Sequence, residues 1–232
     1  EKNNTTAVPS PSAQQPAQPP PDQQVTIDQV KNAFKNSLVK FGDENKKLIL
    51  IEVADPSCPY CHVAAGKNPE LNKQVGDRFK LVSDGGTYVA PVPEMKKLVD
   101  SGKASFAWLY TSGHGNGELG TKALYCAFEK GKFWEVHDKL MTAEGYTLLN
   151  DTVKNDKSKA KEVAEFMKSV FNPSDMQKCL ESGKYDNRLQ EDVTLAKGLG
   201  VQGTPGFLVN TAKFAGAYSF TEMDSAVKTA LK

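Results

Sequence analysis

Two cysteines three positions apart carry the strongest chemical signal in this 232-residue sequence. Cys58 and Cys61 enclose Pro59 and Tyr60 in a Cys-Pro-Tyr-Cys tetrapeptide that closely follows an apolar run. We expect a helix to begin here, because proline suits a first turn whose amides have no helical partners. Those amides and the positive end of the helix dipole favour the thiolate of Cys58, which we expect to be exposed. An attacking thiolate and a second thiol that resolves the mixed disulfide are the minimum for thiol–disulfide exchange.

The alternative use of such a pair is half of a zinc site. Zinc needs two further ligands at matching spacing, and the sequence has no second CxxC and no HxxxH. The three histidines, His62, His114 and His137, are scattered. We therefore expect neither a metal nor a cofactor. His114 lies in a glycine-rich stretch, residues 113–117, and either lines the rim of the active site or is a surface loop residue.

Glu52, six residues before the first cysteine, is the next candidate for the active site. It lies in the most apolar stretch of the chain, residues 47–54, where strand alternation places it on one face with Leu48 and Leu50. A buried carboxylate has a raised pKa, which suits a proton acceptor for the thiol of the second cysteine. The alternative is a solvent-facing glutamate at a strand end.

The order of strands and helices predicts an α/β chain with a helical insertion. The run 47–54 is apolar on both faces apart from Glu52, which indicates a central strand covered on both sides. Further strands are expected at 106–110, 206–210 and 213–217. Helices are expected from Cys58–Pro59 with a kink or restart at Asn68–Pro69, near 94–101, over 118–141 with one helix or two broken near Gly131, and over 158–171. Further helices are expected from the start signal Asn172-Pro173-Ser174, with Gln177 three positions beyond Ser174, over 187–199, and over 221–231 with Thr221 as its cap.

Four motifs in a fixed order resemble the DsbA-like family of thiol–disulfide oxidoreductases. They are Cys-Pro-Tyr-Cys after a strand, Phe-Trp-Glu-Val-His-Asp at 133–138, Cys-Leu-Glu-Ser-Gly-Lys-Tyr at 179–185, and Leu-Gly-Val-Gln-Gly-Thr-Pro at 199–205. The resemblance covers residues 27–232 and implies an α/β thioredoxin-like fold with a helical insertion domain. We place the thioredoxin core at 27–111 and 190–232, and the helical insertion at 112–189.

The resemblance also implies roles for single residues. It makes the first cysteine of the pair the nucleophile and the second the resolving thiol, and it puts Glu52 at the family's buried acidic position. Thr204–Pro205 becomes a cis-proline turn beside the disulfide, although position alone favours a trans bond, and its backbone pairs with an extended substrate peptide. Pro59 and Tyr60 complete the expected substrate-binding surface. Tyr60 departs from the pattern, because the family's strongest oxidants carry a histidine there whose positive charge helps hold the thiolate.

The remaining cysteines, Cys126 and Cys179, both fall in the expected insertion. Many DsbA-like proteins that resemble this chain have a cysteine pair there, so the resemblance implies a structural disulfide between them. The alternative is two buried free thiols that behave as small hydrophobic side chains. Residues 83–103 form a longer connection than the resemblance leads us to expect, and the sequence assigns them no role.

Composition and charge narrow the possible partners. Twenty-nine basic and 28 acidic residues give a net charge of +1 without a basic stripe, so we expect no nucleic-acid partner. The longest apolar run, residues 48–51, is far shorter than the roughly 20 residues of a membrane span. Residues 1–26 are rich in proline, glutamine and serine and predict a disordered linker, which either tethers the domain to a membrane or has no role. An upstream signal peptide or signal anchor would fit such a linker.

We therefore expect a monomeric, extracytoplasmic thiol–disulfide oxidoreductase of the periplasm or cell envelope. Its expected substrates are cysteine-containing secreted proteins, and we expect a dithiol oxidase that a quinone-coupled membrane partner re-oxidises. The even number of cysteines is compatible with an oxidising compartment. The alternatives are a disulfide reductase or isomerase, and a non-catalytic, peptide-binding chaperone module on the same fold. The intact cysteine pair counts against the chaperone, because peptide binding alone does not require two thiols.

Overall fold

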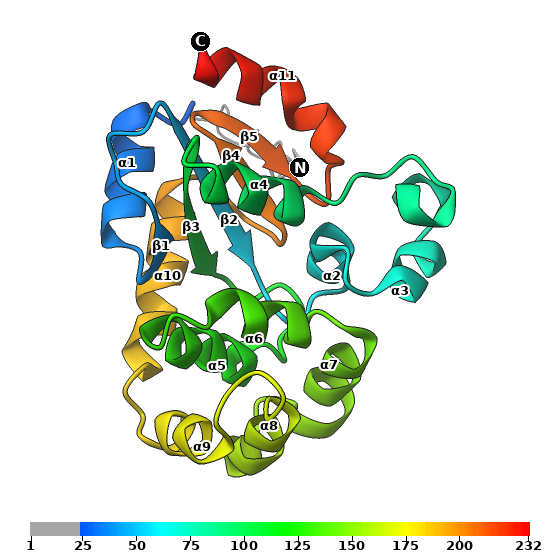
Figure 1. Cartoon of the computed structure of the whole chain (residues 1–232). Coiled ribbons are helices and arrows are strands. Elements are labelled where there is room, and N and C mark those ends of the chain that lie inside the picture. The colour runs from blue at the N-terminus through cyan, green and yellow to red at the C-terminus, as the bar shows by residue number, and fades with distance from the viewer. Residues whose placement is uncertain (1–23) are drawn as a thin grey trace, which may run out of the picture.

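A mixed five-stranded sheet forms the centre of the described chain, with the strand order β1-β3-β2-β4-β5 (Figure 1). The computed structural model describes residues 24–232, so residues 1–23 of the predicted linker 1–26 lie outside the described residues. Strands β2 and β3 are parallel, and the other neighbouring strands are antiparallel. The strands are β1 (Val39–Phe41), β2 (Leu48–Ala54), β3 (Ala104–Tyr110), β4 (Gly206–Val209) and β5 (Ala212–Ala215).

Helices cover both faces of the sheet and one of its ends (Figure 1). Helices α1 and α10 pack on one face, α4 and α11 pack on the other with α2 beside α4, and α5 to α9 gather beyond the end of the sheet. Their bounds are α1 (Ile27–Asn36), α2 (Pro59–Ala65), α3 (Pro69–Gln74), α4 (Pro91–Asp100), α5 (Glu118–Glu129), α6 (Phe133–Leu140), α7 (Ala143–Thr147), α8 (Ala160–Phe166), α9 (Pro173–Glu181), α10 (Asp186–Gly198) and α11 (Phe220–Leu231). Short helical turns are η1 (Asp77–Phe79), η2 (Val82–Asp84), η3 (Leu148–Val153) and η4 (Lys157–Lys159).

Strand β2 is central because its sequence is apolar on both faces. All seven of its residues are buried. Its odd-numbered side chains, Ile49, Ile51 and Val53, belong to the core under α1 and α10, and Leu48 and Leu50 belong to the larger core on the opposite face. Parallel pairing with β3 places the carboxyl ends of the two strands side by side. The loops that follow β2 and β3 therefore meet at the same edge of the sheet.

Two elements near the N-terminus lie outside the sequence expectations. Strand β1 has only three residues and pairs with β3 at the edge of the sheet, so it is too short to show an alternating pattern. Helix α1 directly follows the polar, proline-rich segment. It begins with a capping box in which Thr26 and Gln29 each accept a hydrogen bond from the backbone amide of the other.

One of two predicted helix starts is confirmed, and the other is wrong by two residues. Helix α9 begins at the predicted Asn172-Pro173-Ser174 signal, with Asn172 as its cap. Helix α11 is capped by Ser219 instead of Thr221. The Ser219 hydroxyl also accepts a hydrogen bond from the backbone amide of Val89 at 3.0 Å. This tertiary partner favours the earlier residue, and sequence patterns do not contain it.

The long connection at residues 83–103 has a structural role. About half of it is α4, which packs against β3 and α2 and buries Val92 and Met95. It therefore covers part of the sheet face on which Leu48 and Leu50 lie. The predicted helix at 94–101 begins three residues too late, because Pro91 already occupies its first turn.

A buried carboxylate joins the end of the sheet to the helical part. Asp192 of α10 accepts hydrogen bonds from the hydroxyl of Tyr125 in α5 at 2.5 Å and from the backbone amide of Tyr110 in β3 at 3.1 Å. The guanidinium of Arg188 pairs with the same carboxylate. Burial raises the pKa of Asp192 against the opposing effect of Arg188. Because these groups come from α5, β3 and α10, the network fixes the helical part relative to the sheet.

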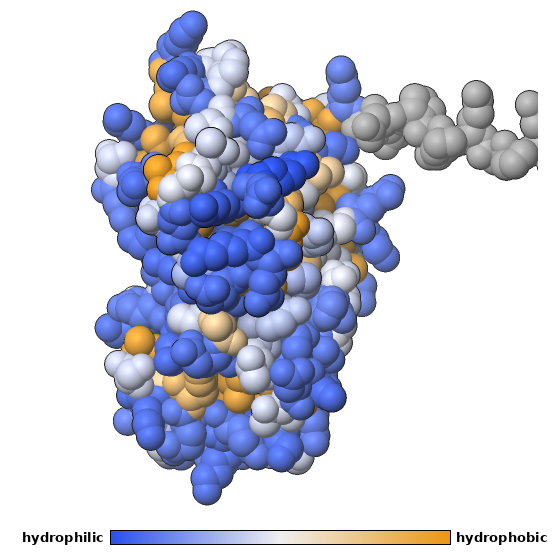
Figure 2. Space-filling view, turned by 90° about the vertical axis from the view of Figure 1, so that its right-hand side faces the viewer, coloured by the Kyte–Doolittle hydropathy of each residue, from blue (hydrophilic) through white to orange (hydrophobic). Residues whose placement is uncertain are grey.

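Figure 2 shows the face that lies on the right-hand side of Figure 1. Hydrophilic residues cover most of this face, and smaller apolar areas lie on its lower, helical part and near its upper left edge. Within residues 24–232, no helix combines the length and apolar character needed to cross a membrane.

Candidate active site

Cys58 and Cys61 lie at the edge of the sheet where β2 ends. Cys58 is the N-cap of α2, and Pro59 is its first residue. Both cysteines are free thiols; Cys58 is 5% exposed and Cys61 is fully buried. The expectation of an exposed Cys58 is therefore wrong. Its sulfur donates to the carbonyl oxygen of Thr204 at 3.5 Å, so a turn from a distant part of the chain lies against it.

The surroundings shift the pKa values of the two thiols in opposite directions. The hydrogen bond with Cys61 is the largest of the effects that lower the pKa of Cys58 to about 6. Burial opposes this shift, while Thr204 and the backbone amides of Cys61 and Tyr60 add to it. The pKa of Cys61 rises well above its usual value, because burial and the neighbouring Cys58 both disfavour its negative charge. Near neutral pH, this arrangement favours a thiolate at Cys58 and a protonated thiol at Cys61.

The amides of the helix start favour the thiolate, as expected. The backbone amides of Cys61 and Tyr60 both lower the pKa of Cys58, although each does so less than the side-chain hydrogen bonds. The larger effect is the thiol of Cys61, which lies one turn along the same helix. The same short spacing therefore supplies both the resolving thiol and the hydrogen bond that holds the thiolate.

Glu52 is buried in the centre of the sheet. It is 1% exposed, and neither carboxylate oxygen has a hydrogen-bond partner within residues 24–232. Burial raises the pKa of this carboxyl to about 8. A charge on Glu52 raises the pKa of Cys61, so the two groups interact. In the sheet Glu52 pairs with Trp108, whose indole N–H also has no partner in the described chain.

A turn between α10 and β4 lies against the cysteines. The Thr204–Pro205 peptide bond is cis, and Cys58 lies against the carbonyl of Thr204. Strand β4 begins directly after Pro205 and pairs with β2, whose end leads to Cys58. Neighbouring strands therefore hold the cysteine pair and the turn together, although 146 positions separate Cys58 from Thr204.

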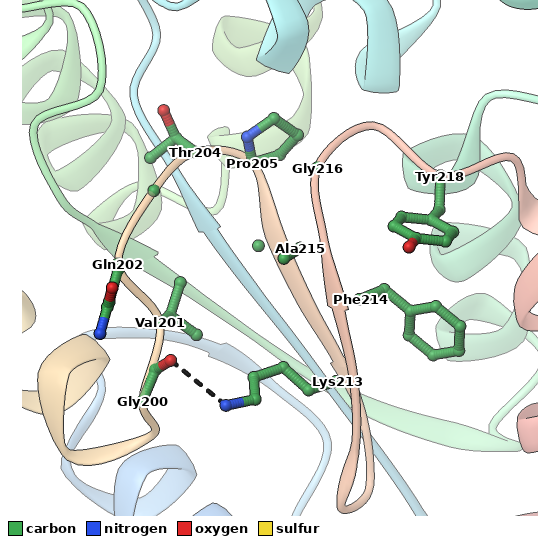
Figure 3. A pocket seen from close by; sticks show the side chains of 12 residues that line it. Gly200, Val201, Gln202, Thr204, Pro205, Lys213, Phe214, Ala215, Gly216 and Tyr218 are labelled. Atoms are coloured by element: carbon green, nitrogen blue, oxygen red, sulfur yellow. Dashed lines mark hydrogen bonds between the residues drawn. The ribbon is translucent and has the colours of Figure 1, made fainter. Parts of the chain in front are cut away.

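A groove of about 620 Å³ runs beside this turn (Figure 3). Its walls are residues 200–206, residues 213–216 and Tyr218, and Thr204 and Pro205 lie at one end of it. Val201, Phe214 and Tyr218 give the groove apolar and aromatic surface. An extended peptide that reaches the turn has room to continue along this groove.

No sequence pattern pointed to Asp55, which is fully buried directly after β2. Its carboxylate accepts five hydrogen bonds: from the amides of Gly113 at 2.8 Å, His114 at 2.9 Å and Gly115 at 3.4 Å, and from the amide and hydroxyl of Ser57 at 2.8 and 2.6 Å. Its backbone amide donates to the sulfur of Cys61 at 3.5 Å, and its carbonyl accepts from the amide of Cys58 at 2.9 Å. Three of the carboxylate's partners are backbone groups 58 to 60 positions away, which leave no signature in side-chain types.

The other candidate residues occupy separate places. Tyr60 is 43% exposed beside the cysteines, and its ring lies 5.8 Å from that of Phe79. His62 is buried, and its two ring nitrogens contact the carbonyl oxygens of Pro56 at 2.8 Å and Met141 at 3.0 Å. Burial lowers the pKa of His62 to about 4, and the hydrogen bonds with these two carbonyl oxygens oppose that shift. His62 therefore links the cysteine loop to the helical part.

A disulfide joins Cys126 of α5 to Cys179 of α9. It links two helices that are 53 positions apart in the chain and in contact in the helical part. The second pair of cysteines is thus a cross-link between helices, and it belongs to different elements from the pair at the end of β2.

Comparisons with known proteins agree with this geometry. Residues 92–229 match a family model described as thioredoxin. The fold resembles that of oxidised BdbD from Bacillus subtilis, with a TM-score of 0.61 and 19% identity over 85% of this chain and 94% of that chain. It also resembles alpha-DsbA1 from Wolbachia pipientis, with a TM-score of 0.59 and 15% identity over 84% of this chain and 91% of that chain. These likenesses confirm the expected α/β, thioredoxin-like fold with a helical insertion.

Curated relatives include a much longer protein. The chain is 24% identical over 192 residues, or 82% of its length, to the Na(+)/H(+) antiporter NhaA 3 of Salinispora tropica. A second such antiporter, NhaA 1 of Salinispora arenicola, is 23% identical over the same length. The chain spans about a quarter (24%) of the length of these relatives.

Proposed function

We propose that this chain, which belongs to the thioredoxin family and has the fold of its DsbA-like thiol–disulfide oxidoreductases, exchanges disulfides with cysteine-containing polypeptides through Cys58 and Cys61. The observation that carries the proposal is the opposite shift of the two thiol pKa values beside the Thr204–Pro205 turn. One thiol is ionised and the other protonated, as an attacking and a resolving thiol require. The adjoining groove offers space for an extended peptide.

In the oxidising direction, the cycle begins with a disulfide between Cys58 and Cys61. A substrate thiolate attacks the sulfur of Cys58, and the sulfur of Cys61 leaves with the electron pair of the broken S–S bond. A second substrate thiolate then attacks the substrate sulfur of the mixed disulfide and releases Cys58 as a thiolate. The substrate loses two electrons and gains a disulfide, and the chain is left as the dithiol. A leaving thiolate with a pKa of about 6 makes the release step fast.

Glu52 supplies the proton for the less acidic sulfur in this cycle. With a pKa of about 8, its carboxyl is largely protonated near neutral pH. It gives that proton to Cys61 as this sulfur leaves the disulfide, and in the reverse direction it accepts the proton from the thiol. Asp55 does not serve as this proton donor, because its carboxylate already accepts five hydrogen bonds.

We assign the dithiol oxidase direction, because a stabilised Cys58 thiolate favours the reduced form of the pair over its disulfide. We further propose an extracytoplasmic site of action, a monomer, and re-oxidation by a quinone-coupled membrane partner. The Cys126–Cys179 disulfide supports an extracytoplasmic location, because structural disulfides persist mainly in oxidising environments. The substrates proposed are secreted proteins that carry free cysteines.

The reduction potential of the Cys58–Cys61 pair tests the direction. We expect equilibration with glutathione to give a value toward the oxidising end of the range of about −270 to −120 mV that thioredoxin-like proteins span. A value near −270 mV would support a reductase instead, which is the second candidate function. A chain that binds peptides but exchanges no disulfide with them would contradict both and leave the chaperone module.

A further inference from the structure

The loop between β3 and α5, residues 113–117, has no part in the exchange reaction described above. We propose that this loop is a third wall of the substrate site, positioned by Asp55, and that it presents the His114 side chain to the bound polypeptide. The inference rests on the proposed function, because it concerns the substrate of the same cysteine pair. The other two walls are the Thr204–Pro205 turn and the groove beside it.

The loop touches the turn that faces the nucleophile. A Cβ built on Gly113 would lie 1.7 Å from the Thr204 hydroxyl oxygen and 2.9 Å from the Thr204 Cβ, so only glycine allows this approach. The carbonyl of the same threonine accepts the hydrogen bond from the sulfur of Cys58 at 3.5 Å. The loop and the sulfur therefore contact the same residue. A polypeptide joined to Cys58 in a mixed disulfide has to pass beside this loop.

Buried hydrogen bonds give the loop one position. The carboxylate of Asp55 accepts hydrogen bonds from the consecutive amides of Gly113, His114 and Gly115. Consecutive amides of this kind form a compact anion-binding turn. A Cβ on Gly117 would lie 1.8 Å from a carboxylate oxygen of Asp55, so the far end of the loop is also packed on this residue. Since Asp55 is fully buried, breaking these three bonds would leave its Oδ2 without a hydrogen-bond donor.

A second set of contacts ties the loop to both neighbouring parts. The Ser57 hydroxyl accepts from the amide of Asn116 at 3.1 Å, and the Asn116 side chain donates to Asn150 of the helical part at 3.1 Å. Asn150 in turn donates to the carbonyl of Ser57 at 3.1 Å. The loop is thus held from the cysteine segment on one side and from the helical part on the other.

The loop holds its backbone through these bonds and leaves its outer surface free. His114 is exposed, and its side chain makes no hydrogen bond within residues 24–232, although its amide is fixed by Asp55. A ring on an ordered backbone loses little further entropy when it contacts a ligand. The chemistry that fits this wall is an extended polypeptide, whose residues beside the substrate cysteine reach the ring. A small dithiol such as dithiothreitol reaches the sulfur without reaching His114.

The experiment compares a peptide substrate, which reaches His114, with dithiothreitol, which does not. The rate of exchange is measured for a reduced two-cysteine peptide and for dithiothreitol, in the wild type and in His114→Ala, Gly113→Ala and Asp55→Asn. We expect His114→Ala to lower kcat/KM for the peptide about tenfold, or about 1.4 kcal/mol, and to leave the dithiothreitol rate unchanged. Gly113→Ala should lower the rates with both substrates, because its Cβ displaces Thr204, which lies against the sulfur of Cys58. Gly198→Ala is the matched control, because a Cβ at Gly198 meets no atom within 4 Å.

Asp55→Asn separates positioning of the loop from an effect on the thiols. We expect the peptide rate to fall about tenfold more than the dithiothreitol rate, because the Asp55 side chain holds the loop and this residue meets the cysteines through its backbone. Equal losses with both substrates would show that Asp55 acts on the cysteines and would overturn its role as a positioning residue. If this variant does not fold, the wall is still tested by His114→Ala.

An unchanged ratio of the peptide rate to the dithiothreitol rate in His114→Ala, or unchanged rates with both substrates in Gly113→Ala, overturns the wall and leaves the proposed function intact. A wild-type chain that reacts with neither substrate overturns both proposals together.

Discussion

The two cysteine pairs of this chain have the same atoms and different surroundings. Cys58 and Cys61 lie three positions apart at the end of a buried strand, as free thiols whose pKa values are shifted in opposite directions. Cys126 and Cys179 lie 53 positions apart in α5 and α9, and their sulfur atoms are bonded to each other. The first pair meets a buried carboxyl, a carbonyl oxygen and a groove, whereas the second connects two packed helices. The reactivity of a cysteine is thus set by what its neighbours do to its thiolate.

The largest effect that separates the pairs is loss of the nucleophile. We expect Cys58→Ser to reduce exchange with a reduced peptide to background, because no other thiol near the turn is ionised. Cys61→Ser keeps the nucleophile and removes the resolving thiol, so it should accumulate a mixed disulfide that non-reducing gels detect. Exchange that persists in Cys58→Ser would mean that the two pairs do not differ as described.

Removal of the second pair should affect stability instead. A cross-link that closes a loop of 53 residues stabilises a fold by up to about 4 kcal/mol on the chain-entropy estimate. We expect the double variant Cys126→Ala, Cys179→Ala to unfold at lower denaturant concentration and to keep its exchange rate at temperatures where it is folded. If this double variant kept full stability and lost most of its exchange activity, the second pair would relay electrons. The two pairs would then not divide into a reactive one and a structural one.

The buried carboxyl beside the first pair predicts a pH effect on stability. The pKa of Glu52 is raised from 4.5 to about 8 in the folded chain. The folded state therefore binds the proton more tightly, and this stability is fully present below pH 4.5 and is lost as the pH rises through about 8. Glu52→Gln should abolish this fall in stability between pH 4.5 and pH 8. It should therefore raise the free energy of unfolding by roughly 3 kcal/mol at pH 7.

Urea unfolding of the reduced protein between pH 4 and pH 9 measures this effect. Glu70→Gln is the control, because it makes the same substitution at an exposed side chain. Glu222→Gln would be a poor control, because Glu222 accepts a hydrogen bond from the amide of Ser219 in the capping box of α11. Parallel stability curves for wild type and Glu52→Gln would contradict the buried position of Glu52.

The smallest expected effect is the pH profile of alkylation. With the pKa of Cys58 lowered from 9.0 to about 6, its reaction with iodoacetamide should rise with a midpoint near pH 6. The same shift stabilises the folded dithiol form fully above pH 9, and that stability is lost as the pH falls through about 6. Peptide mapping should find the label on Cys58 before Cys61, whose pKa is raised. A midpoint near pH 9 would remove the electrostatic difference between Cys58 and an ordinary thiol.

Local patterns in the sequence determined much of the fold. The apolar run at 48–54 predicts a central strand, and Cys-Pro-Tyr-Cys predicts the helix start that carries the first pair. These features depend on residues that are neighbours along the chain, so spacing and residue type are enough to read them. The order of the four motifs is also a property of the sequence alone, and it carries the resemblance to DsbA-like proteins.

Only the tertiary structure decided how the site works. Thr204 comes to Cys58 from 146 positions away, and Asp55 gathers amides from a loop 58 to 60 positions along the chain. The near-complete burial of Cys58, the three loop amides bonded to Asp55 and the cap at Ser219 all depend on which segments meet in space. The physical reason is that backbone amides and carbonyls are the same in every residue. Their pairing is set by the arrangement of strands and loops, and no pattern of side chains records it.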